Sequence, residues 1–118
     1  MSSERELTPD RVSELLGAGE LELVDVRTPE EHGAGHVAGA RHVPLERLSE
    51  AAGQLDDSKT LVFYCRSGER SAAAAEALVA SGREAYSMSG GLLAWHEQGL
   101  PLEPDGGEVI ELSGLPPA

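Results

Sequence analysis

The chain has 118 residues, of which 40% are hydrophobic and 25% charged, and this composition suits one soluble domain with a modest core. Its formal net charge of −12, from nine basic and 21 acidic residues, argues against non-specific binding to nucleic acid and against docking on anionic lipid. No apolar stretch approaches the roughly 18 residues that span a bilayer, and residues 1–6 lack the basic start and apolar centre of a signal peptide, so we expect a cytoplasmic protein.

The first half of the chain predicts one clear helix, a buried strand and two shorter elements. Residues 9–17 predict a helix, because a threonine precedes a proline at the first helical position and a glycine can end the helix. Residues 21–26 alternate weakly and predict a buried strand that ends in charged residues. Residues 28–31 start a short helix or turn, and residues 41–44 predict a short strand stopped by proline.

The second half of the chain predicts helices and strands in alternation. Residues 45–55 predict a helix, and residues 60–64 predict the central strand. Residues 69–80 predict a strong helix that contains four consecutive alanines. A short strand over residues 85–88 and a helix over residues 90–98 complete the pattern. The alternation implies a mostly parallel sheet covered by helices on both faces.

The composition changes near the C-terminus, where a Glu-Pro-Asp-Gly-Gly segment is typical of a linker. We therefore divide the chain into a domain of residues 1–102 and a tail of residues 103–118. Within the tail, residues 108–112 suit a small edge strand, and residues 115–118 are expected to be frayed.

The most informative segment surrounds Cys65, the only cysteine of the chain. It stands where the central strand meets a glycine-containing turn, just before a predicted helix. Free N–H groups and the partial positive charge of the helix start, together with Arg66 and Arg70, should make this thiol ionise more easily than a free one. The same N–H groups can hold an anion. The segment therefore predicts a reactive thiolate in an anion-binding cup.

Several pieces of the sequence, taken together, resemble a single rhodanese domain, the family of sulfurtransferases and their relatives. The pieces are Asp25-Val26-Arg27 with Glu30-Glu31, residues 35–40 with Val43-Pro44, residues 65–71, and Gly90-Gly91 with Trp95. They follow the order and spacing of the family over about residues 7–102, and the tail is not covered. The resemblance implies a rhodanese-like three-layer α/β sandwich, with a five-stranded parallel sheet flanked by helices on both faces. It also implies ping-pong chemistry through a cysteine persulfide, and no metal or cofactor.

The resemblance places the family's catalytic position on Cys65. The residues that fall on its substrate-binding loop are Arg66, Ser67, Gly68, Glu69, Arg70 and Ser71. The implied reaction takes a sulfane sulfur from a small anionic donor, such as thiosulfate or a low-molecular-weight persulfide. Because the chain has no second thiol, the sulfur must pass to an external acceptor, which is a small thiol, cyanide or a partner protein.

Individual roles within the loop follow from residue chemistry. Arg66, at the pocket rim, or Arg70 can hold the departing sulfite, although Arg70 can instead pair with a glutamate of its own helix. Gly68 lets the loop turn back tightly. Ser71 can cap the following helix and donate to a loop carbonyl or to sulfur. Glu69 is expected to be solvated; alternatively it discourages highly charged donors or favours a cationic acceptor.

Outside the loop, structural roles are expected. Arg27 should form a network with Asp25 and pair with Glu30 or Glu31. His36 should fix its own loop through hydrogen bonds, and Trp95 should lie in the core. Three histidines are expected on the surface: His32, His42 and His96. The four histidines do not show metal-ligand spacing.

Two other functions remain open at this stage. One is a cysteine-dependent phosphatase or arsenate reductase that uses the same cup. Its loop is one residue longer than the four residues between Cys65 and Arg70, which makes a wider cup, so the shorter loop favours sulfur over phosphate. The other is a non-enzymatic interaction module with a catalytically silent pocket.

Overall fold

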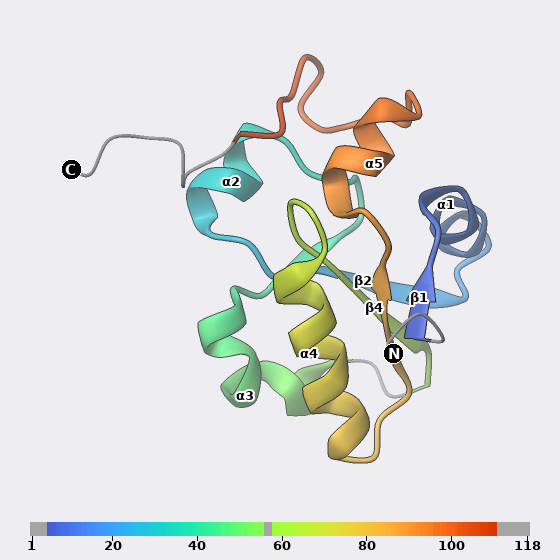
Figure 1. The fold of residues 1–118 in the computed structure, drawn as a ribbon, viewed down its shortest axis with the longest axis vertical. Helices are drawn as coiled ribbons and strands as arrows, with labels where there is room; N and C mark the ends of the chain where they lie inside the picture. The colour runs from blue at the N-terminus through green and yellow to red at the C-terminus, as the bar shows by residue number, and fades with distance from the viewer. Residues whose placement is uncertain (1–4, 56–57, 111–118) are drawn as a thin grey trace.

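A computed structural model describes residues 5–55 and 58–110, which fold as a five-stranded parallel sheet with helices around it (Figure 1). The strand order is β1-β5-β4-β2-β3, and every neighbouring pair is parallel. The strands are β1 (Glu6–Leu7), β2 (Leu21–Asp25), β3 (Arg41–His42), β4 (Thr60–Tyr64) and β5 (Ala85–Met88). The predicted α/β fold with a five-stranded parallel sheet is therefore confirmed.

Helices cover both faces of this sheet. They are α1 (Pro9–Gly17), α2 (Pro29–Ala34), η2 (Leu45–Arg47), α3 (Leu48–Ala51), η3 (Ala52–Gln54), α4 (Glu69–Ala80) and α5 (Gly91–Glu97), of which η2 and η3 are 3-10 helices. In Figure 1, α3 and α4 lie on one side of the sheet, and α1 and α5 on the other. Among the described residues, no helix has both the length and the apolar character that a bilayer crossing requires.

The central strand supplies both halves of the core, because its side chains alternate between the two faces. Leu61 and Phe63 pack with the buried face of α4, whereas Val62 and Tyr64 pack with α1 and α5. All four side chains are buried, as expected for a parallel strand covered on both sides. Trp95, on α5, is buried on the same face of the sheet as Val62 and Tyr64, which confirms its predicted place in the core.

Two helix starts agree with the sequence signals. The Thr8 hydroxyl accepts a hydrogen bond from the N–H of Arg11 at 3.4 Å, at the start of α1. At the start of α2, the Thr28 hydroxyl accepts from the N–H of Glu31 at 3.2 Å, and the Glu31 carboxylate accepts from the N–H of Thr28 at 3.1 Å. This reciprocal capping box fixes the position of Glu31.

The predicted helix over residues 45–55 is wrong in detail. It forms as η2, α3 and η3 in succession, and no side chain caps the start of any of the three. 3-10 turns are frequent at the ends of short helices, and Gly53 in the last turn lowers the helix propensity of this segment.

The fifth strand is β1, which we did not predict, and not an edge strand of the tail. Residues 108–110 have no regular secondary structure; residues 111–112 and the predicted frayed end over 115–118 lie outside the described residues. The start of the tail instead lies beside the end of α2 and the residues after it. His36 and Glu103 form an antiparallel bridge through two main-chain hydrogen bonds, at 2.9 and 2.7 Å. The N–H of Glu108 also donates to the carbonyl of Ala34 at 2.8 Å.

The sheet topology defines where a site belongs. From β2 the chain crosses to β3 on one side, whereas β4 is followed by β5 on the other side. The carboxyl ends of β2 and β4 therefore form the topological switch point, where open α/β sheets bind their ligands. Arg27 lies just after β2, and Cys65 directly after β4.

Candidate active site

The Cys65 sulfur lies inside the turn between β4 and α4. Its Sγ accepts a hydrogen bond from the N–H of Gly68 at 3.1 Å, and the side chain is only 1% exposed. Gly68 has a φ of 117°, a conformation that a residue with a Cβ rarely adopts, so glycine allows the turn to close over the sulfur. A main-chain amide aimed at sulfur stabilises negative charge on it.

The start of α5 holds this turn from the other side. The carbonyls of Cys65 and Arg66 accept hydrogen bonds from the N–H groups of Leu92 and Leu93, at 2.8 and 3.0 Å. A Cβ on Gly91 would lie 2.5 Å from the carbonyl oxygen of Arg66, and Gly91 has a φ of 61°. This close approach explains the glycine at position 91, which lets the start of α5 lie directly against the cysteine loop.

Ser71 lies at the base of the loop, in the first turn of α4. Its hydroxyl is 3.6 Å from the Cys65 sulfur, donates to the carbonyl of Gly68 at 3.2 Å and is 2.7 Å from the hydroxyl of Ser87. The predicted contact with a loop carbonyl is confirmed. The predicted capping role is wrong, because Gly68 is the N-cap of α4 and no side chain caps it. Ser87 was missed, and its signal is a lone polar residue facing inwards on an apolar strand.

Arg70 is paired with a residue far away in the sequence. Its two terminal nitrogens donate to the two carboxylate oxygens of Glu31, on α2, at 2.8 and 2.9 Å. Burial raises the pKa of Glu31, but hydrogen bonds from Arg70 and Thr28 outweigh burial and hold the pKa below its ordinary value. The alternative in which Arg70 pairs with a glutamate of its own helix is therefore wrong, since its partner Glu31 lies on α2.

Arg27 and Asp25 form a second, fully buried pair. The Arg27 Nε and Nη2 groups donate to the Asp25 carboxylate at 2.8 and 2.7 Å, and Nη2 also donates to the carbonyl of Gly35 at 2.7 Å. Burial raises the pKa of Asp25, but the bonds from Arg27 more than offset it, so the pKa lies below its ordinary value. The predicted network of Arg27 with Asp25 is confirmed, whereas the predicted pairing with Glu30 or Glu31 is wrong.

Three histidines stack beside this pair. The His32 ring lies between the rings of His36 and His42, with centroid distances of 3.9 and 4.3 Å, and its Nδ1–H donates to Asp25 at 2.8 Å. Burial lowers the pKa of His32, and the two neighbouring rings act in the same direction. The Nδ1–H of His36 donates to the carbonyl of His32 at 2.8 Å, which confirms that His36 fixes its loop.

Two surface predictions for histidine are wrong and one is right. His32 and His42 are half-buried in the stack, and His42 donates from Nε2 to the carbonyl of Arg27 at 2.8 Å, whereas His96 is exposed. Across residues 5–55 and 58–110, no group of three or more histidine, cysteine or carboxylate side chains is arranged for a metal ion.

The remaining loop residues lie at the surface of the turn. Glu69 is exposed and accepts a hydrogen bond from the Ser67 hydroxyl, which lowers the pKa of its carboxyl group. The expectation of a solvated Glu69 is thus confirmed. Arg66 is half-buried.

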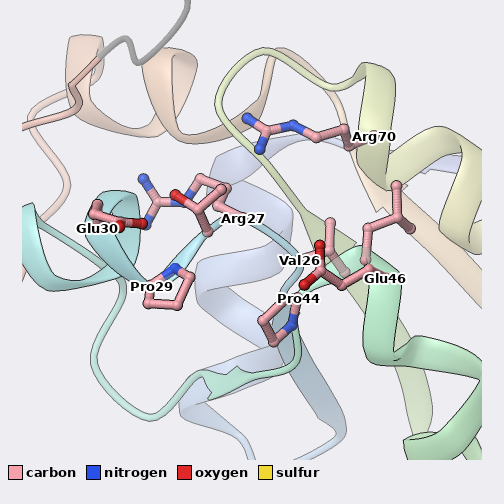
Figure 2. A pocket seen from close by; sticks show the side chains of 9 residues that line it. Val26, Arg27, Pro29, Glu30, Pro44, Glu46 and Arg70 are labelled. Atoms are coloured by element: carbon pink, nitrogen blue, oxygen red, sulfur yellow. The ribbon is translucent and has the colours of Figure 1, made fainter. Parts of the chain in front are cut away.

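A pocket of about 540 Å³ opens beside the loop at the carboxyl ends of β2 and β3 (Figure 2). We call it the β2–β3 pocket. Its apolar lining comes from Val26, Pro29, Pro44 and Leu45. Its charged lining comes from Arg27, Glu30, Glu46 and Arg70. Arg70 lines the pocket and also belongs to the cysteine loop, so the pocket and the loop are adjacent at this residue.

Comparison with known proteins points to one family. The family model described as the Rhodanese-like domain matches residues 8–98. Thiosulfate sulfurtransferase GlpE of Shewanella oneidensis is 35% identical over 98 residues, which cover 82% of this chain and 97% of GlpE. A rhodanese-related protein of Thermoplasma volcanium has a similar structure, with a TM-score of 0.78, 31% identity, and coverage of 83% of this chain and 96% of that one.

Other relatives are longer than the matched segment. The HTH-type transcriptional regulator Rv0324 of Mycobacterium tuberculosis is 38% identical over 88 residues, which cover 73% of this chain but only 39% of the regulator. Several further curated relatives are covered over between 26% and 64% of their length. The same kind of domain thus occurs within larger proteins.

Proposed function

This chain belongs to the rhodanese-like domain family, and we propose that it is a sulfurtransferase that carries a sulfane sulfur on Cys65. The observation that supports this most is the Cys65 sulfur at the switch point of the sheet, 3.1 Å from the N–H of Gly68. The similarity to a thiosulfate sulfurtransferase over nearly the whole length of that enzyme supports the same reaction class.

In the first half-reaction, the Cys65 thiolate attacks the outer sulfur of a donor such as thiosulfate. The bond between the two donor sulfurs breaks, and sulfite leaves with the electron pair. Cys65 then carries a persulfide, Cys–S–S⁻. The total charge is unchanged, because a thiolate and the thiosulfate dianion become a persulfide anion and the sulfite dianion. The Gly68 N–H, 3.1 Å from the Cys65 sulfur, supports the proposal because it can stabilise charge on the attacking atom. In this proposal Arg66 holds the departing anion.

In the second half-reaction, an acceptor thiolate or cyanide attacks the outer sulfur of the persulfide. A new bond to that sulfur forms, the S–S bond to Cys65 breaks, and the Cys65 thiolate is regenerated. Because the S–S bond is about 2.05 Å long, the persulfide moves the reactive atom outwards from a side chain that is itself 1% exposed. Direct contact with an acceptor therefore becomes easier after sulfur loading.

The ion pair of Arg70 argues against a substrate role for that residue. Both terminal nitrogens of Arg70 already bind Glu31, so Arg70 instead ties the loop to α2. This pairing also argues against the phosphatase alternative, in which the loop arginine has to hold phosphate with both nitrogens.

The test is to incubate the protein with thiosulfate and measure its intact mass. We expect a gain of one sulfur atom, released by cyanide as thiocyanate and absent in Cys65→Ser. Glutathione persulfide and inorganic polysulfide serve as further donors. If none of the three donors loads Cys65, the proposal is wrong.

A second candidate is a non-enzymatic module, favoured by the burial of Cys65 and by the similarity to a transcriptional regulator. Alkylation separates the two candidates. A sulfurtransferase should react with iodoacetamide near neutral pH faster than free cysteine does. A rate no faster than free cysteine, with no sulfur loading, would favour the silent module.

A further inference from the structure

The β2–β3 pocket has an apolar interior next to the cysteine loop. Val26 and Leu45 line it from the end of β2 and from η2, and two prolines complete the apolar part. Its volume of about 540 Å³ exceeds the space that one small inorganic anion needs. Arg70 belongs to both the pocket lining and the loop that holds Cys65, so a molecule in the pocket contacts a residue of that loop.

Both arginines of the pocket are already neutralised. Arg27 binds the Asp25 carboxylate through two nitrogens, and Arg70 binds the Glu31 carboxylate through two nitrogens. Each guanidinium therefore faces a compensating charge at hydrogen-bond distance. The pocket thus lacks the uncompensated positive charge that would attract an anionic ligand.

Two lining carboxylates, in contrast, have no partner among residues 5–55 and 58–110. Glu30 on α2 and Glu46 on η2 are exposed, and neither carboxylate makes a hydrogen bond or ion pair with another residue in the described part of the chain. Figure 2 shows them on opposite sides of the pocket. The pocket as a whole is therefore apolar inside and negative at its edges, and the chain's net charge of −12 adds long-range attraction for cations.

We propose that the β2–β3 pocket docks a basic segment of an acceptor protein, next to the loop that holds the sulfur-carrying Cys65. A lysine or arginine side chain matches the pocket, because its apolar stem can lie on the proline and leucine surface while its charged end meets Glu30 or Glu46. This inference rests on the proposed sulfurtransferase function and specifies the class of acceptor. It also separates the two substrates: the small anionic donor at the loop amides and the cationic acceptor at the pocket.

The experiment uses Cys65 loaded with sulfur from thiosulfate and two short peptides. The peptides differ only in whether lysines or glutamates flank their single cysteine. Transfer is followed under single-turnover conditions for the wild type, for Glu30→Gln/Glu46→Gln, and for Glu76→Gln/Glu97→Gln. The last variant is the matched control, because it removes two exposed carboxylates outside the pocket lining and changes the net charge equally. Binding of serine versions of both peptides is measured in parallel.

We expect the wild type and the control variant to transfer sulfur to the lysine peptide about five- to tenfold faster than to the glutamate peptide. In Glu30→Gln/Glu46→Gln this preference should fall to about twofold or less, and transfer to the neutral thiol dithiothreitol should not change.

Equal rates and equal binding for the two peptides would overturn the docking site while leaving the proposed function standing. An equal loss of preference in the control variant would also overturn it, since overall charge would then be the cause. A protein that takes up no sulfur at all would contradict the proposed function itself.

Discussion

The two loops that follow β2 and β4 meet at the same edge of the sheet, but they are stabilised in different ways. The loop after β4 surrounds Cys65 mainly with main-chain groups and small residues such as Gly68. The end of β2 and the loop after it bury charged side chains, with Asp25 and Arg27 fully inaccessible. The ion pair between Glu31 and Arg70 connects them. In the reactive loop the Gly68 N–H is directed at the sulfur, whereas the charged side chains that support this loop come from the neighbouring one.

Removing a charge from the loop after β2 should have the largest effect on stability. Asp25→Ala leaves Arg27 buried without its carboxylate, and we expect a loss of about 3–5 kcal/mol in the free energy of unfolding. Urea denaturation measures this loss. Cys65→Ser, in the other loop, should cost about 1 kcal/mol or less and abolish sulfur transfer.

A double variant tests whether the buried charge itself causes this loss of stability. In Asp25→Asn/Arg27→Met the buried charge is removed together with its partner, so we expect much of the lost stability to return. Similar losses in the single and double variants would show that the charge pair is not the cause.

The close main-chain contact between α5 and the cysteine loop can be tested at Gly91. Gly91→Ala places a Cβ 2.5 Å from the carbonyl oxygen of Arg66 and requires an unfavourable φ, so we expect a loss of about 1–3 kcal/mol and slower sulfur loading. Gly17→Ala, which meets no atom within 4 Å, is the matched control. Unchanged loading by Gly91→Ala would mean that the loop tolerates displacement.

The stabilising effect of the ion pair between Glu31 and Arg70 should depend on pH. Because the pKa of Glu31 is lowered in the folded protein, its stabilising effect is fully present above its ordinary pKa of 4.5 and is lost as the pH falls through the folded value. We expect Glu31→Gln to cost about 1–2 kcal/mol at pH 7 and progressively less below pH 4.5. Denaturation of both proteins from pH 7 to pH 3 measures the difference, and a constant difference would exclude the ionised pair as its source.

The smallest effect concerns the approach of the donor. The net charge of −12 repels a small anion such as thiosulfate, so screening by salt should raise kcat/KM about two- to threefold between low and physiological ionic strength. Steady-state kinetics across a potassium chloride series provide the measurement. An unchanged kcat/KM would show that the electrostatic field of the protein does not affect the approach of the donor.

The parts of the structure predicted from the sequence are those with local signals. The bounds of β4, α4 and β5 agree with prediction, because their apolar runs and the alanine-rich segment specify them within a few residues. The Cys65 loop followed from one cysteine, one glycine and a helix start. These features depend on residues that are close in the sequence, so local sequence patterns are sufficient to predict them.

The parts that prediction missed depend on distant residues. Glu31 and Arg70 are 39 positions apart, and only the fold brings them together. The two-residue strand β1 exists because β5 offers it main-chain partners, and no pattern can emerge from Glu6 and Leu7 alone. The histidine stack similarly requires α2 and β3 to meet at the edge of the sheet.

The antiparallel bridge between His36 and Glu103 has a practical consequence for handling this protein. A recombinant version truncated after residue 102 would expose the main chain of His36 and the carbonyl of Ala34, both of which are bonded to later residues. Those atoms border the helix that carries Glu31. Expression boundaries and affinity tags are therefore better placed beyond residue 110, where they leave the support of the cysteine loop intact.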